Sequence, residues 1–227
     1  MTSGSTVWGS SRRLLGTALG ALGVFLLLAI VSGVGWTDGF DSSVHSWMVA
    51  HRVGGLTDVA RALTRVASSV ALVALAVVGV AAGPSRSWRR RLLAAALLVL
   101  VHVLGLVVRL AVAELIRRQR PPRVDWATDA SGFAFPSGHA STATIAAVLV
   151  AWVMVTAVPN RRRTLALVWV VAGSWAVAIG LTRIYLGVHW PTDVLGGWAF
   201  GTAWGTAGFL VIRSWISAPG DLPRTLR

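Results

Sequence analysis

The stretch Leu92–Ala113 reads LLAAALLVLVHVLGLVVRLAVA and contains one charged residue, Arg109. A run of this length spans the apolar core of a bilayer, which takes about 20 residues of α-helix. Five other apolar runs have a similar character, namely Leu14–Val34, Val66–Ala82, Ala140–Val158, Thr164–Leu181 and Val194–Ile212. The sequence therefore predicts an all-α, polytopic membrane protein with six transmembrane helices.

Composition supports one membrane domain over residues 1–227. The chain is 55% hydrophobic and only 13% charged, whereas soluble domains carry roughly a quarter charged residues. The net charge is +13, and every basic residue is arginine. These arginines lie in short clusters between apolar runs, so we expect no nucleic-acid partner. The chain has no cysteine, which excludes disulfides and thiol chemistry.

The arginine clusters predict the orientation of the chain. On one side of the six spans lie Arg12, Arg13, Arg86, Arg89, Arg90, Arg91, Arg161, Arg162, Arg163, Arg213, Arg224 and Arg227. Positive residues favour the cytoplasmic side, so both termini are predicted to be inside a plasma membrane, with a bacterial membrane as the preferred setting. We interpret the first span as an uncleaved anchor, since its apolar run is longer than a usual signal core.

The outer side then receives three segments, 35–65, 117–136 and 183–192. In the first, Phe40, Val44, Trp47 and Met48 have helical spacing, which predicts an amphipathic outer-face helix. Two roles remain open for it. It either lies passively among the lipid headgroups or forms a lip that guides a headgroup into a site.

Polar clusters at the outer ends of the spans carry the candidate chemistry. They are Arg117-Arg118-Gln119-Arg120-Pro121-Pro122, Pro136-Ser137-Gly138-His139, and Thr182-Arg183 followed by His189 and Asp193. Arginine forks match the paired oxygens of a phosphate. Ser137 and Gly138 precede an apolar run, and the start of a helix favours an anion.

The two histidines in these clusters suit phosphoryl transfer. His189 and Asp193 are four residues apart, so the carboxylate is able to orient the imidazole and to stabilise the charge that develops on attack. His139 is a second imidazole, suited to protonating a leaving oxygen. These residues require neither a metal ion nor another cofactor.

The same three clusters resemble the signature motifs of the type-2 phosphatidic acid phosphatase superfamily, which includes lipid phosphate phosphatases and undecaprenyl-pyrophosphate phosphatases. The resemblance implies that His189 is a nucleophile forming a phosphohistidine, with Asp193 as its partner and His139 as the acid. It also implies phosphate binding by Arg120, Arg183, Ser137 and Gly138. The motifs lie within residues 113–193.

The sequence departs from the family pattern at two positions. Thr182 replaces the usual serine and keeps the hydroxyl. Ala113 stands where the family has a lysine, seven residues before Arg120. We expect Arg117 or Arg118 to restore the missing positive charge in the phosphate site. Arg109 also lies one turn from Ala113, and either a functional role or snorkelling to the interface is open for it.

The predicted function is metal-independent dephosphorylation of a membrane lipid at the outer face. Isoprenoid pyrophosphate, phosphatidic acid and phosphatidylglycerol phosphate all remain candidate substrates, and the oligomeric state is not readable. Three alternatives stand beside this prediction: an anionic-lipid binding or transport protein, a weakly active family member lacking the lysine, and vanadate-dependent oxidation. The clustering of charge at one face rather than at the midplane argues against a transporter.

Overall fold

A computed structural model describes residues 4–81, 87–157 and 162–216. Over these residues the chain forms seven α-helices and one short 3-10 helix. In order, they are α1 (Gly4–Gly33), α2 (Asp38–Ala50), α3 (Gly54–Ala81), α4 (Trp88–Ile116), η1 (Arg123–Asp125), α5 (Gly138–Ala157), α6 (Arg162–Tyr185) and α7 (Pro191–Ile216).

Six of these helices are long and apolar enough to cross a membrane, which confirms the predicted all-α fold with six spans. The second span differs from its predicted bounds, because α3 begins at Gly54 rather than near Val66. Asp58, Arg61 and Arg65 interrupt the apolar pattern there. The segment 35–65 is therefore not one amphipathic unit. Its first part is α2, and its last part is the polar beginning of α3.

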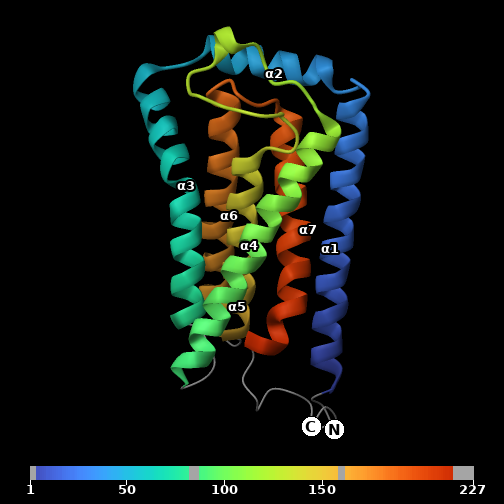
Figure 1. Ribbon diagram of the computed structural model, residues 1–227, viewed down its shortest axis with the longest axis vertical. Coiled ribbons are helices and arrows are strands. Elements are labelled where there is room, and N and C mark those ends of the chain that lie inside the picture. The colour runs from blue at the N-terminus through green and yellow to red at the C-terminus, as the bar shows by residue number, and fades with distance from the viewer. Residues whose placement is uncertain (1–3, 82–86, 158–161, 217–227) are drawn as a thin grey trace.

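The six spans stand side by side, and α2 lies across one end of the bundle (Figure 1). One face of α2 is directed into the protein, where Val44 and Met48 pack against a cluster of Ala140, Ile184 and Val194. Phe40 and Trp47 are exposed. Of the four residues with helical spacing, two therefore pack against the bundle and two do not, and α2 covers the end of the bundle with one face.

The span α5 is the most buried of the six and contacts α3, α4, α6 and α7. Glycines allow α7 to approach it closely. A Cβ on Gly197 would lie 2.8 Å from the Ala140 Cβ, and one on Gly201 would lie 2.6 Å from the Thr144 Cβ. This close approach brings the start of α7 against the start of α5.

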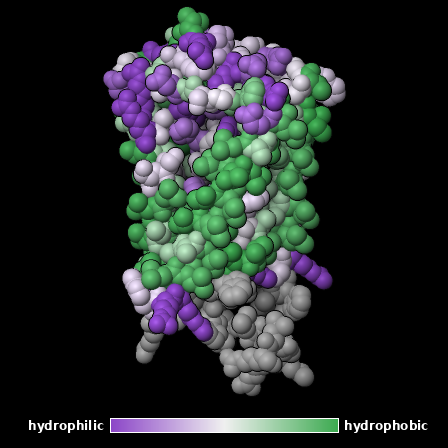
Figure 2. Space-filling view, in the orientation of Figure 1, coloured by the Kyte–Doolittle hydropathy of each residue, from purple (hydrophilic) through white to green (hydrophobic). Residues whose placement is uncertain are grey.

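Polar residues collect at the two ends of the bundle, with an apolar belt between them (Figure 2). The end opposite α2 is where α1 begins and α7 ends (Figure 1). The described arginines of the predicted cytoplasmic set lie at that end. Arg86, Arg161, Arg224 and Arg227 lie outside the described residues.

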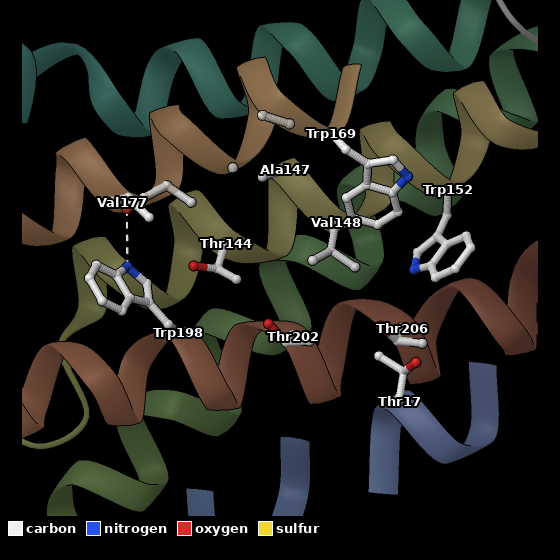
Figure 3. A pocket seen from close by; sticks show the side chains of 13 residues that line it. Thr17, Thr144, Ala147, Val148, Trp152, Trp169, Val177, Trp198, Thr202 and Thr206 are labelled. Atoms are coloured by element: carbon white, nitrogen blue, oxygen red, sulfur yellow. Dashed lines mark hydrogen bonds between the residues drawn. The ribbon is translucent and has the colours of Figure 1, made fainter. Parts of the chain in front are cut away.

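An apolar groove of about 320 Å³ lies between α5, α6 and α7 and reaches Thr17 of α1. Its lining includes Thr144, Trp198 and Thr206 (Figure 3). Trp198 crosses from α7 to α6 by donating a hydrogen bond to the Ala176 carbonyl at 3.0 Å. No residue of the three polar sequence clusters lines this groove, so the candidate chemistry lies elsewhere.

Candidate active site

Arg120 connects the loop after α4 to the loop before α7. Its Nε and Nη2 atoms donate to the carbonyls of Gly132 and Ser131 at 2.9 and 2.8 Å. Its Nη1 donates to the Val188 carbonyl at 2.7 Å and lies 2.9 Å from His189 Nε2. The guanidinium therefore orders the segment 117–136 and presents positive charge to His189.

The contact with Arg120 determines the tautomer of His189. A guanidinium only donates hydrogen bonds, so Nε2 must carry its lone pair toward Arg120. The proton then lies on Nδ1, which faces Asp193 Oδ2 at 3.3 Å. His189 precedes the first residue of α7, Pro191, so a turn rather than a helix brings the two side chains together. The lone pair of Nε2 therefore faces Arg120, while the Nδ1–H faces the carboxylate.

Asp193 is fully buried and held from three directions. Its Oδ2 accepts a hydrogen bond from the Trp190 backbone N–H at 2.9 Å, and its Oδ1 accepts from Arg118 Nη1 at 2.7 Å. Arg118 Nη2 in turn donates to Asp41 Oδ2 at 2.6 Å. Asp41 also accepts from the Thr192 backbone N–H at 3.0 Å. The buried face of α2 is thus joined to the partner of His189 through Arg118.

The beginning of α5 faces the same region. Ser137 precedes the first helical residue, Gly138, and its N–H donates to the Asp193 carbonyl at 2.9 Å. The Ser137 Oγ is fully buried and has no hydrogen-bond partner. The His139 side chain, half-buried in the first turn, makes no hydrogen bond with the described residues. Free polar groups at a helix start are suited to holding an anion.

Arg183 approaches from the end of α6 and is only 2% exposed. Its Nη1 donates to Thr64 Oγ1 of α3 at 3.1 Å, while its Nε is buried without a partner. The Thr64 hydroxyl also lies 3.1 Å from that of Thr182. The hydroxyl retained at position 182 therefore belongs to the contact that positions Arg183.

The structure places Arg117 and Arg118, the two predicted substitutes for the missing lysine, in different surroundings. Arg117 ends α4 with φ 54° and is exposed, and its Nε donates to the Glu114 carbonyl at 3.1 Å. Its side chain turns back along its own helix, away from the other clusters. Arg118 is paired with the buried carboxylates of Asp41 and Asp193, and the exposed Asp38 lies 3.9 Å away. Arg109, in contrast, lies buried beside Gly138.

These motifs and the six-span bundle agree with the comparisons to known proteins. Residues 91–216 match the PAP2 superfamily. The chain belongs to this family. It is 30% identical to phosphatidylglycerophosphatase B of Bacillus subtilis over 78% of this chain and 85% of that protein.

A second curated protein and a solved structure extend the comparison. Decaprenylphosphoryl-5-phosphoribose phosphatase of Mycolicibacterium smegmatis is 38% identical over 66% of this chain and 74% of its own. The crystal structure of a transmembrane PAP2-type phosphatidylglycerolphosphate phosphatase from Bacillus subtilis has a TM-score of 0.75 at 26% identity. That match covers 92% of this chain and 98% of the other. The predictions of a multi-pass membrane protein and of a lipid phosphate phosphatase are confirmed.

The electrostatic setting of this PAP2 site keeps His189 neutral. Burial, followed by the charges of Arg120, Arg183 and Arg109, lowers the pKa of His189 well below 6.5. Burial also lowers the pKa of Arg120. Burial alone would lower the pKa of Arg118 as well, but Asp193 and Asp41 outweigh it and raise that pKa. The site thus holds a neutral imidazole surrounded by arginine side chains.

The site therefore gathers His139, His189, Asp193, Arg120, Arg183, Ser137 and Gly138 at one end of the bundle. Among the described residues, no group of three or more His, Cys, Asp or Glu side chains is placed to bind a metal ion.

Sequence reasoning missed Asp41 and Thr64, because a lone acid on an amphipathic helix and a threonine near a span end carry no motif. His45, on the same helix as Asp41, is also buried, and its Nε2 lies 3.0 Å from Asp125 Oδ2. A helical-wheel pattern that places Asp41, Val44, His45 and Met48 on one face was the available signal.

Proposed function

We propose that this PAP2 protein removes a phosphate from a lipid headgroup through a phosphohistidine formed on His189. The observation that carries the proposal is the position of His189 Nε2, with its lone pair directed to Arg120 at 2.9 Å and Asp193 behind Nδ1. This is the tautomer that a histidine nucleophile requires. The buried carboxylate favours the positive ring that forms on attack.

The surroundings of His189 support binding of a phosphate. Ser137 Oγ and Arg183 Nε are both buried donors without partners, and leaving such groups unsatisfied costs roughly 1–3 kcal/mol each. Phosphate oxygens would satisfy both of them. The start of α5 adds the backbone N–H groups and the positive end of its dipole. We assign Arg120, Arg183, Ser137 and Gly138 to the phosphate.

The reaction would run in two balanced steps. In the first, the Nε2 lone pair attacks phosphorus, the ester P–O bond breaks, and the leaving oxygen takes a proton from His139. In the second, water attacks the phosphohistidine, His139 takes the proton of that water, and the P–N bond breaks. The products are the dephosphorylated lipid, inorganic phosphate and free His189.

The membrane setting supports an outer-face site. The site lies at the α2 end of the bundle, and the exposed Arg12, Arg13, Arg90 and Arg163 lie at the other end. If the arginine-rich end faces the cytoplasm, the site faces outside, and the start of α1 and the end of α7 both lie on the cytoplasmic side. The substrate would then be drawn from the outer leaflet.

We propose a lipid with a phosphate-bearing headgroup as substrate. Two relatives that share most of their length with this chain are named for such lipids, a phosphatidylglycerophosphatase and a decaprenylphosphoryl-5-phosphoribose phosphatase. An undecaprenyl-diphosphatase from Sulfolobus acidocaldarius matches over only 31% of this chain. Phosphatidylglycerol phosphate is therefore our first choice, ahead of phosphatidic acid and undecaprenyl pyrophosphate.

The test is phosphate release by the purified protein in detergent, with EDTA present, on each of the three lipids. We expect release from phosphatidylglycerol phosphate that His189→Ala abolishes. The matched control is His51→Ala, since His51 is exposed at the end of α2. Lipid labelled on the terminal phosphate should also label the protein, and the label should be lost in acid but retained in alkali. Equal release by His189→Ala and the unaltered protein would refute the mechanism.

A further inference from the structure

Arg109 is a buried cation two turns before the end of α4, within an apolar stretch of that span. It is 7% exposed. Its Nε donates to the Pro136 carbonyl at 2.7 Å, and its Nη2 lies 3.5 Å from the Phe133 carbonyl. Both carbonyls belong to the segment that leads into α5. The guanidinium is therefore fixed beside the start of α5 and does not snorkel to the interface.

The contact with Gly138 places Arg109 at the proposed phosphate site. A Cβ built on Gly138 would lie 3.4 Å from Arg109 Cζ and 3.6 Å from its Nη1. The guanidinium thus lies against the backbone that begins α5, where free N–H groups favour an anion. Its Nη1 makes no hydrogen bond with any described residue. That atom is the one free to take a ligand oxygen.

The local charges are unbalanced without an anion. Among the described residues, no carboxylate forms an ion pair with Arg109, Arg120 or Arg183. Asp193, the acid beside His189, is paired with Arg118 at 2.7 Å. Buried charges in a membrane protein are costly unless they are paired, so three unpaired guanidiniums indicate a negatively charged ligand.

Ala113 leaves the site without a cation at this position of α4, so a third arginine beside Arg120 and Arg183 would make up for it. This position, one helical turn after Arg109, is 3% exposed and carries no charge. Residues four apart lie on the same face of a helix. Arg109 is thus on the face of α4 from which a longer cationic side chain at position 113 would also approach the site.

We propose that Arg109 is a catalytic residue that binds the substrate phosphate through Nη1 and supplies the positive charge that Ala113 lacks. This inference rests on the proposed function, because it assigns a further ligand to the same phosphate. It replaces the assignment of Arg117 and Arg118 to that role. With Arg109 as a ligand, the phosphate site has its full set of positive charges despite the missing lysine, and the protein need not be a weakly active family member.

The experiment compares Arg109→Gln, Arg109→Lys and the control Arg117→Gln, which removes an exposed arginine from the end of the same helix. Phosphate release from phosphatidylglycerol phosphate is measured together with inhibition by orthovanadate, a phosphate analogue. We expect Arg109→Gln to lower kcat/KM by about 100-fold, as for loss of one donor to a developing charge. Inhibition by vanadate should weaken at least tenfold. Arg117→Gln should change neither by more than twofold.

The conservative and rescue variants separate binding from folding. Arg109→Lys keeps the buried charge, so it should fold and retain more activity than Arg109→Gln. The double variant Arg109→Gln/Ala113→Lys should regain at least tenfold of the lost activity.

Unchanged vanadate inhibition in both Arg109 variants overturns the inference. If the unaltered protein releases phosphate and His189→Ala does not, that result leaves the proposed function standing. If the unaltered protein neither releases phosphate nor responds to vanadate, the proposed function itself fails.

Discussion

The two ends of the bundle use the same residue type in opposite ways. At the end away from α2, Arg12, Arg13, Arg90 and Arg163 are exposed. At the α2 end, Arg109, Arg118 and Arg183 are buried or nearly so, and Arg120 is half-buried. Each buried guanidinium contacts named carbonyls, hydroxyls or carboxylates from at least one other segment. The exposed arginines contribute positive charge near a membrane surface, whereas the buried arginines contribute specific hydrogen bonds and ion pairs.

This difference shows that the number of arginines at one end says little about how much each contributes to stability or activity. An exposed charge in water interacts weakly and is screened by salt. A buried one must have its donors satisfied, so removing it changes both stability and the site. Substitutions of the same kind at the two ends therefore provide a direct comparison.

The largest difference is expected between Arg183→Gln and Arg163→Gln, which lie at opposite ends of α6. Arg183 has a buried Nε without a partner beside the proposed phosphate, and its loss should lower kcat/KM by about 10³-fold, or roughly 4 kcal/mol. Arg163→Gln should leave kcat/KM within a factor of two. Phosphate-release kinetics in detergent measure both variants. Similar losses in the two would remove the distinction between the ends.

The second-largest effect is expected for Arg118, and it is an effect on the free energy of unfolding rather than on kcat/KM. Arg118→Gln leaves Asp41 and Asp193 buried without their shared cation, which should cost roughly 3 kcal/mol. The double variant Asp41→Asn/Arg118→Gln should recover part of the loss, since one uncompensated carboxylate is then gone. Thermal unfolding in detergent reports both effects. A melting temperature unchanged by Arg118→Gln would argue against this network.

The pH dependence of kcat/KM should show the lowered pKa of His189. Protonated His189 has no lone pair for attack, so activity falls as the pH falls through the pKa of this residue. Burial and neighbouring cations lower that pKa well below 6.5, so the acid limb should lie below the ordinary histidine value. The profile of kcat/KM reports the free enzyme and is the quantity to measure. An acid limb at or above pH 6.5 would contradict this electrostatic setting.

The smallest effect is expected for Arg90→Gln, at the exposed start of α4. Surface substitutions away from specific contacts usually change stability by less than about 0.5 kcal/mol. Both the melting temperature and kcat/KM should therefore stay close to those of the unaltered protein. A large loss in either would show that the arginine-rich end contributes more than surface charge.

Much of the site was predictable because its residues are close in sequence or form a motif. His189 and Asp193 are four residues apart, and Ser137 directly precedes a helix start, so local geometry already relates them. The start of α3 was not predictable from hydropathy, since Asp58 and Arg61 resemble loop residues. In the fold they form an ion pair with each other at 3.0 Å, and Arg61 also donates to the Ala127 carbonyl.

The sequence by itself determined the membrane fold, the number of spans and the family, because apolar run length and motif spacing are local properties of the chain. The tertiary structure decided which cations meet at the site. Arg109 and Arg117 are equally arginines of one helix end in the sequence, yet one is buried against Gly138 and the other exposed. Which of the two arginines is buried depends on how α4 packs beside α5. Packing between segments that are distant in sequence cannot be deduced from the residue spacing within either segment.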